Sequence, residues 1–297
     1  SGPSTCPNND CNFDATFATV TGKGAPQSVG GTTGPAIKAN VNWLTQSSAQ
    51  GSNVLSLTTQ GADGSGSVTD GGNGGAITFT QPGGVFTSLE STPDSSDGSV
   101  PWRPYWAVVD VLSVGGSGSI YDRTVNFNTF TTVGAGGKGG AISATIKDSP
   151  SVGDIFGVSQ LSTPVAYYLF QSRGGSGAAD SRHRGAAGTN GDGGRVDVTI
   201  EDIDWASNPL PDSKFYGVVA ASVGGASNVS GSGVTMNATS SGSGGDVTLS
   251  FDNSKLNFSG LGQSIGLVAT STGDLIAANS EPFKSAANSN FGDVTVT

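Results

Sequence analysis

Short stretches in which apolar and polar residues alternate recur along this chain, and each follows one or two glycines. The copies cover residues 74–79, 139–144, 193–198, 244–249 and 292–296. The glycine next to each stretch recurs after 65, 54, 51 and 47 residues. Alternation with a period of two gives a β-strand one apolar and one polar face, so each copy predicts a half-buried strand.

A second recurring segment lies between these copies and consists of a short apolar strand that ends in serine and glycines. Its copies cover 106–116, 167–175, 216–225 and 264–273, with looser forms at 54–61 and 26–31. No long stretch has the period of a helix. We expect the glycines to supply positive φ at corners and to let stacked backbones approach each other. Each unit is therefore a strand, a glycine-rich turn, a strand and a variable connection.

A unit of about 50 residues with short strands cannot bury its own apolar face, but stacked units can bury theirs. We therefore predict an all-β fold, a right-handed parallel β-helix (solenoid) with loop insertions, in which each unit makes about two turns. The alternative is one or more β-sandwiches, which would need hairpin signals between matched strands. Asn190-Gly191 is such a signal, but it lies inside a glycine tract.

Composition and charge narrow the range of partners. The chain of 297 residues contains 48 glycines, only 12% charged residues and a net charge of −10. An acidic surface repels nucleic-acid phosphates and anionic lipid, so we expect no nucleic-acid partner. No apolar run approaches the length of a membrane span, so we expect no membrane insertion by this segment.

The two cysteines, Cys6 and Cys11, bracket a run of turn-forming residues. We expect a small disulfide loop in an N-terminal cap segment, residues 1–21, ahead of a repeat array over 22–297; two free thiols are the alternative. The chain has one histidine, so zinc is not expected. The phrase 190–194 resembles a single calcium-binding nonapeptide, but such sites need tandem copies, and we expect a structural turn. No metal and no cofactor are predicted.

The two repeated segments also resemble a known family. Residues 217–225, followed by 244–249, resemble the pattern G-I-x-A-Q-S-I-G-G-G-G-G-x-G-G-x-V-x-V of large bacterial autotransporter passengers, and 265–271 resemble the start of the next unit. The resemblance extends over 22–297, with insertions at 117–135 and 176–191 in place of longer glycine runs.

That resemblance implies a β-helix secreted through an outer-membrane barrel and displayed on the bacterial cell surface. It implies an adhesin with a role in virulence, whose partner is a host glycan, an extracellular protein or the same protein on a neighbouring cell. The chain stops in mid-pattern at Thr297, so we expect a fragment of a longer passenger.

Two insertions contain the candidate binding residues. The insertion at 93–106 holds Trp102, Arg103, Tyr105 and Trp106 beside two prolines, and aromatic and arginine side chains dominate many binding sites. The alternative is that this loop packs on an apolar edge of the coil, with Trp106 in the core.

The second insertion is rich in glycine and alanine and carries Arg182 and Arg184. With Arg173 nearby in the repeat, these arginines form a candidate cationic patch. Because arginine binds carboxylates through two hydrogen bonds, this patch could meet an acidic glycan or another carboxylate.

The alternative function is a polysaccharide-degrading β-helix enzyme, a hydrolase or a lyase. It would need several carboxylates or a base converging in one groove. Ser181 with His183, and Asp202 with Asp204 beside Glu201, are the best candidates, and a further acidic pair is Asp94 and Asp97. We expect each group to be a solvated loop and predict that the chain is not an enzyme.

Overall fold

A computed structural model gives the fold of most of the repeat array. The structure describes residues 10–15, 18–23, 26–27, 30–46, 55–81, 85–87, 106–125, 128–147, 165–178, 188–202, 215–225, 242–254, 265–273, 275–276, 284–285 and 291–297. Within these ranges every regular element is a β-strand.

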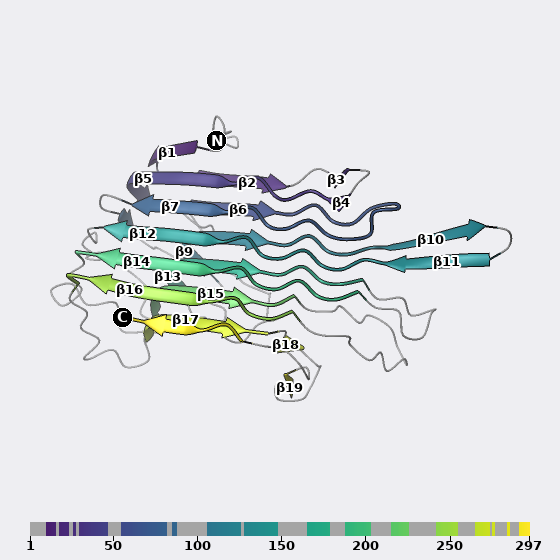
Figure 1. Cartoon of the computed structure of the whole chain (residues 1–297). Helices are drawn as coiled ribbons and strands as arrows, with labels where there is room; N and C mark the ends of the chain where they lie inside the picture. Colours follow the sequence, from purple (N-terminus) through teal and green to yellow (C-terminus); the bar gives the residue numbers. More distant parts are fainter. Residues whose placement is uncertain are drawn as a thin grey trace.

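Two large parallel sheets make up the body of the molecule (Figure 1). Sheet A contains β1 (Asp10–Ala15), β5 (Ile37–Gln46), β7 (Ile77–Gln81), β12 (Ile142–Lys147), β14 (Val196–Glu201), β16 (Val247–Asp252) and β20 (Val294–Val296), with β8 (Val85–Thr87) also paired to β5. Sheet B contains β2 (Ala18–Lys23), β6 (Leu55–Gln60), β9 (Trp106–Val114), β13 (Val165–Arg173), β15 (Phe215–Val223) and β17 (Ile265–Thr272). The remaining strands pair in antiparallel twos: β3 (Pro26–Gln27) with β4 (Gly30–Gly31), β10 (Ile120–Val125) with β11 (Asn128–Val133), and β18 (Leu275–Ile276) with β19 (Lys284–Ser285).

The core lies between the inner faces of the two sheets. Alternate residues of each strand point inward, and parallel pairing keeps equivalent residues in register, so Ile142 lies between Ile77 and Val196. All three of these side chains are buried. In the middle of the core, Tyr168 donates a hydrogen bond to Gln81 Oε1 at 2.8 Å, which satisfies a fully buried amide oxygen. The predicted alternation of buried and exposed positions is therefore confirmed.

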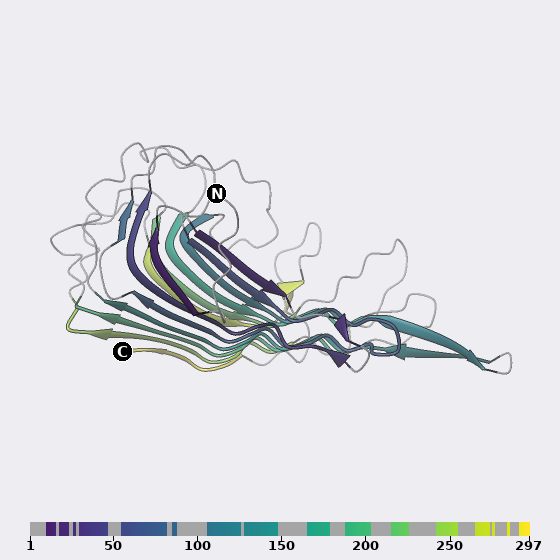
Figure 2. The same cartoon turned by 90° about the horizontal axis from the view of Figure 1, so that it is seen from above.

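Apart from β8 and the antiparallel pairs, successive strands alternate between the sheets, and each sequence unit adds one strand to sheet A and one to sheet B. The predicted parallel β-helix is confirmed, but the prediction of two turns per unit is wrong, because one unit makes one turn. Seen from the N-terminal end in Figure 2, the chain runs clockwise as it moves toward the C-terminus, so the coil is right-handed.

Beyond the sheets, the glycine-rich segments run out to one side and back as a flat double layer (Figure 2). We call this layer the glycine wing; it comprises residues 30–36, 61–76, 115–119, 134–141, 174–178, 188–195, 224–225 and 242–246. The direction in which its backbone N–H groups donate repeats every three residues. Gly71 and Gly74 donate to the next turn in their own layer, whereas Gly72 donates across to Ala62 of the other layer. Three residues per turn is the period of polyproline II, which leaves every backbone group free to bond outward.

The glycines of the wing are needed for close approach between backbones. A Cβ on Gly116, Gly137 or Gly175 would overlap the carbonyl group of a residue in a neighbouring segment. Among the glycines in the described ranges, only Gly66 has positive φ, at 58°. The expectation of close approach is confirmed, and the expectation of positive φ at the corners is wrong except at Gly66.

A column of buried hydroxyls joins sheet B to the wing. Ser172 Oγ donates to the carbonyl of Gly140 at 2.7 Å and accepts from the N–H of Gly194, one turn further on, at 2.9 Å. Ser113 and Ser222 bridge the turns on either side in the same way. In β9, β13 and β15, this serine therefore replaces a direct backbone hydrogen bond between adjacent turns.

Candidate functional site

Most of the predicted site residues lie outside the described part of the chain. Trp102, Arg103, Tyr105, Arg182 and Arg184 all do so, and their roles stay predictions. Trp106 begins β9, as its place in the repeat predicted, and pairs with Val165.

The predicted disulfide is also untested, since Cys6 is outside the described residues and Cys11 is placed only as part of β1.

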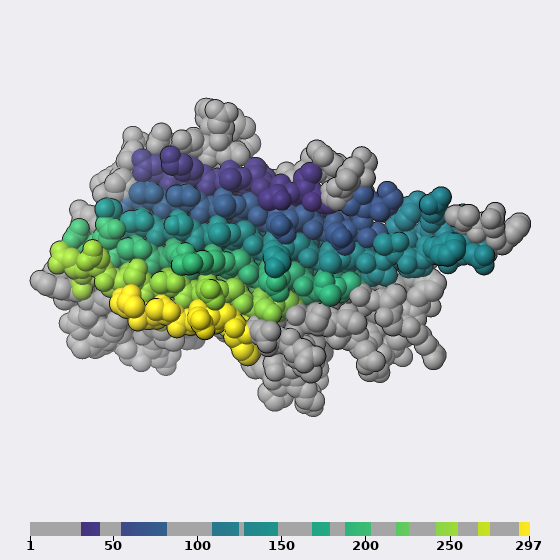
Figure 3. Space-filling model, in the orientation of Figure 1, coloured from purple at the N-terminus to yellow at the C-terminus, as the bar shows by residue number. Residues whose placement is uncertain are grey.

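An exposed element that the sequence reasoning missed stands at the free end of the wing. Residues 117–135, noted in the sequence only as an insertion, contain the antiparallel hairpin of β10 and β11. This hairpin, which we call the arm, extends past every other described element (Figures 1 and 3). Two alternating segments separated by residues 126 and 127 were the available signal, which a search for Asn-Gly alone does not detect.

One face of the arm satisfies its own polar groups. Asp122 lies opposite Thr131, whose hydroxyl donates to Asp122 Oδ1 at 2.8 Å. Thr124 lies opposite Thr129, and their hydroxyls are 3.4 Å apart. Cross-strand pairs of this kind stabilise a two-stranded ribbon that has no core of its own.

The other face combines a cation with aromatic side chains. Arg123 lies opposite Phe130, and Tyr121 lies opposite Thr132. Since alternate residues of a strand share a face, Tyr121, Arg123 and Phe130 project from the same side of the arm. Phe130 is 59% exposed, although it is one of the largest apolar side chains in the described ranges. Exposing it costs solvation free energy that a bound partner would recover.

The wing fixes the base of the arm. The N–H of Ser119 donates to the carbonyl of Thr69 at 2.7 Å, and that of Gly134 donates to the carbonyl of Ser119 at 2.9 Å. Gly118 donates to the carbonyl of Ser176 in the next turn. The bonds to Thr69 and Ser176 tie the start of the arm to the preceding and the following turn, and the bond from Gly134 to Ser119 joins its two strands, so the base of the arm is fixed.

Three cations of the coil and wing form ion pairs with neighbouring carboxylates. Lys138 pairs with Asp192 at 3.0 Å, and Arg195 pairs with Asp197 at 2.7 Å. The hydrogen bond and the charge of Asp197 raise the pKa of Arg195. Lys147 is held by Glu201 in the same way, and its pKa is also raised.

By contrast, Arg123 is exposed and forms no ion pair within the described structure. Its guanidinium can therefore meet an external carboxylate without breaking an internal pair.

The side chains considered as candidates for catalysis or calcium binding form bonds within the chain wherever the structure describes them. Glu201 pairs with Lys147, and Asp202 Oδ1 accepts from Asn253 of the next turn at 2.7 Å. Asn190 Oδ1 accepts a hydrogen bond from the N–H of Gly177 at 2.7 Å. In the segment 190–194, which resembles a calcium-binding nonapeptide, this side chain therefore has a structural role.

Asp204, Asp94, Asp97, Ser181 and His183 lie outside the described ranges. Within those ranges no three His, Cys, Asp or Glu side chains gather closely enough to hold a metal ion.

Comparisons with known proteins add no assignment. Protein-family models, curated proteins and solved structures give no match to the chain. The described residues also contain no helix with the length and apolarity that crossing a membrane requires. Any functional assignment therefore depends on the geometry of the coil, its wing and its arm.

Proposed function

We propose that the chain is a surface-displayed adhesive scaffold, the β-helical part of an autotransporter-like passenger, and that the arm is its contact element. The observation that carries this proposal is the exposed Arg123–Phe130 pair on a hairpin that projects beyond the coil. A rigid framework with a projecting contact element is a common arrangement in binding proteins, because the framework limits the entropy lost on binding.

The chemistry of the arm suits a protein partner. Arginine and aromatic residues account for much of the energy at the centre of protein interfaces, where an apolar ring fills a pocket and a guanidinium pairs with a carboxylate. The partner surface would therefore offer an apolar pocket next to an acidic group. A second copy of this chain, with its net charge of −10, offers carboxylates too, so self-association is one form that the adhesion can take.

The proposal is tested by probing arrays of extracellular proteins and glycans, and immobilised copies of the chain itself, with purified wild-type protein. Three variants are probed in parallel: Phe130→Ala, Arg123→Ala and, as the control on the opposite face, Thr129→Ala. Loss of about 1.4 kcal/mol or more at a contact residue weakens binding at least tenfold. We expect that loss in the first two variants and near-wild-type binding in the control.

Equal binding by all four proteins would show that the arm is not the contact element. Binding confined to glycans would remove the protein partner from the proposal and leave adhesion in place.

A further inference from the structure

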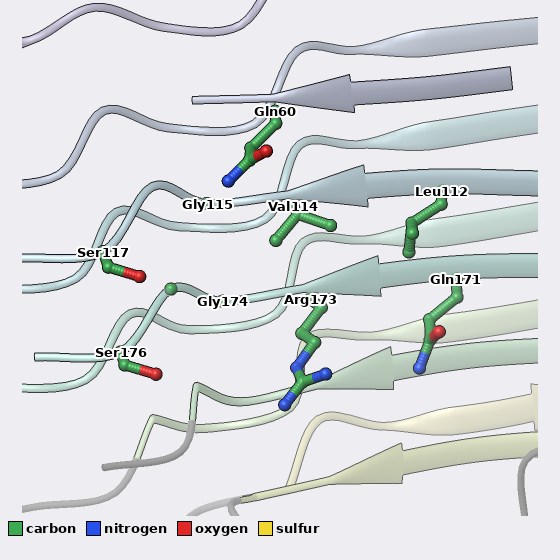
Figure 4. A pocket seen from close by; sticks show the side chains of 10 residues that line it. Gln60, Leu112, Val114, Gly115, Ser117, Gln171, Arg173, Gly174 and Ser176 are labelled. Carbon is green, nitrogen blue, oxygen red and sulfur yellow. The ribbon is translucent and has the colours of Figure 1, made fainter. Parts of the chain in front are cut away.

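A shallow hollow lies where sheet B passes into the wing, and Gln60, Gln171 and Arg173 are among the residues that line it (Figure 4). Arg173 already interacts within the chain, and the side-chain oxygen of Gln171 has less than 1 Å² of accessible area. Neither group therefore gives this hollow a ligand site. The outer edge of β11, in the arm, is a stronger candidate for binding.

The register of the arm determines which backbone groups of β11 point outward. The N–H of Gly134 donates to the carbonyl of Ser119, so these two residues form a hydrogen-bonded pair at the base of the arm. Such pairs alternate with non-hydrogen-bonded pairs in an antiparallel ribbon, so Phe130 bonds to β10, whereas the backbone of Thr129 and Thr131 faces away from it. Among the described strands β11 pairs only with β10, and no other backbone hydrogen bond of the described residues reaches its outer edge. This edge is therefore a template for a further strand.

The sequence of β11 lacks the features that protect the edges of natural sheets. Its six residues read Asn-Thr-Phe-Thr-Thr-Val, without a charge, a proline or a glycine, and every side chain is at least partly exposed. Threonine, phenylalanine and valine all favour strands. β10 carries Asp122 and Arg123, and charged residues are a common device against edge-to-edge pairing. Of the two strands of the arm, β11 is therefore the one suited to accept a partner.

We propose that the arms of two copies of this chain pair edge to edge through β11, antiparallel about a two-fold axis. This inference rests on the proposed role of the arm as the contact element, and it names the partner. With the axis at Phe130, this residue lies opposite Phe130 of the other copy, and Thr129 lies opposite Thr131. The outward N–H and C=O groups of both threonines then bond across the axis, and the two arms form one four-stranded sheet.

The same arrangement covers the exposed ring and separates the like charges. Side chains are closest at a non-hydrogen-bonded pair, so the two Phe130 rings, each 59% exposed in the single chain, cover one another. Arg123 lies on the outer strand of each copy, three strand spacings or about 14 Å from its counterpart. This distance exceeds the screening length of about 8 Å at physiological salt. Pairing through β10 would bring the two arginines onto adjacent strands, so charge also favours the edge of β11.

Sedimentation velocity of the whole chain, at about 10 μM to about 500 μM, tests this proposal. Two short strands make a smaller contact than a standard protein interface, so we expect a weak dimer with a Kd of about 100 μM. Phe130→Ala, which removes the central ring, should weaken the dimer about tenfold or more.

Proline substitutions on the two edges separate backbone pairing from other effects. Thr129→Pro removes an outward N–H from β11 and should weaken the dimer about tenfold or more. Thr124→Pro, at the opposing position in β10, is the matched control, because both variants lose the same contact between the hydroxyls of Thr124 and Thr129. It should dimerise as wild type does, and so should Thr129→Ala, which keeps the backbone N–H.

The proposal is overturned if the wild-type chain is monomeric at about 500 μM, or if the two proline variants dimerise to the same extent. The arrays described above show whether the proposed function fails with it. A monomeric chain whose binding to another protein still depends on Phe130 and Arg123 would remove the pairing alone. A chain that neither dimerises nor shows any binding that depends on the arm would remove the proposed function as well.

Discussion

Replacing Gly137 by alanine is predicted to disrupt the glycine wing, although the change adds a single methyl group. The new Cβ would overlap the carbonyl group of Gly72 and lie 2.9 Å from the carbonyl oxygen of Gly71. Both obstacles are backbone atoms, which cannot rotate away as a side chain can. The two segments must therefore move apart by more than about 1 Å to reach ordinary van der Waals separation.

That movement breaks hydrogen bonds on both sides of the substituted residue. Gly137 donates to Gly116 at 2.9 Å and accepts from Gly175 at 2.7 Å, and Gly116 donates to Gly72 at 2.7 Å. Adding about 1 Å to these distances takes them past the limit of a hydrogen bond. At about 1–3 kcal/mol for each buried pair left unsatisfied, the cost is about 3–9 kcal/mol. This is comparable with the whole stability of a typical domain.

The assay is urea denaturation followed by circular dichroism, with Gly66→Ala as the matched control. A Cβ on Gly66 meets nothing within 4 Å, so only its positive φ is penalised, at about 1 kcal/mol. We expect Gly137→Ala to be insoluble or to unfold at much lower urea than the control. If the two variants are equally stable, the close packing of glycine segments in the wing is wrong.

Three further changes test the buried hydrogen bonds and the charges of the coil by the same denaturation assay. Ser172→Ala leaves the carbonyl of Gly140 and the N–H of Gly194 unsatisfied and should lower the free energy of unfolding by about 2–4 kcal/mol. The control Ser143→Ala, on the exposed face of β12, should lower it by less than about 0.5 kcal/mol, and equal losses would contradict the bridging role of Ser172. Tyr168→Phe removes one buried hydrogen bond and should cost about 1–2 kcal/mol, so an unchanged midpoint would argue against that bond. Burial raises the pKa of Asp192, but the N–H of Ser243 and the ammonium group of Lys138 outweigh it and lower the pKa below its usual value. The stability that the Asp192 carboxylate supplies is therefore present above the pKa of this group in the unfolded chain, and it is lost as the pH falls through the lower pKa of the folded protein. Below about pH 4, Asp192→Asn should lose less stability than wild type. If the stability of the two proteins falls in parallel with pH, this assignment is wrong.

The sequence predicted the strands because the evidence for them is local. Alternation places Ile77 and Phe79 on one face of a short segment, and both side chains are buried in the structure. The number of turns per unit could not be predicted in this way, because the pairing of β7 with β12 depends on how far the intervening chain travels, and no local pattern contains that distance.

The candidate site was less accessible to sequence reasoning. The insertion around Trp102 is a candidate because of its aromatic composition. The arm has an ordinary composition, and only its position at the end of the wing makes it a candidate. The exposure of Phe130 depends on that position.

The most direct test of the proposed function is to remove the arm without disturbing the coil. The preceding turn closes its own tip with a short bridge between Ser65 and Val68, so the sequence 65–68 is a natural replacement for residues 120–133. We predict that the exchanged protein keeps the circular dichroism spectrum and urea midpoint of wild type and no longer adheres to the partner found on the arrays. Unchanged adhesion by a folded protein without the arm would contradict the proposed role of the arm.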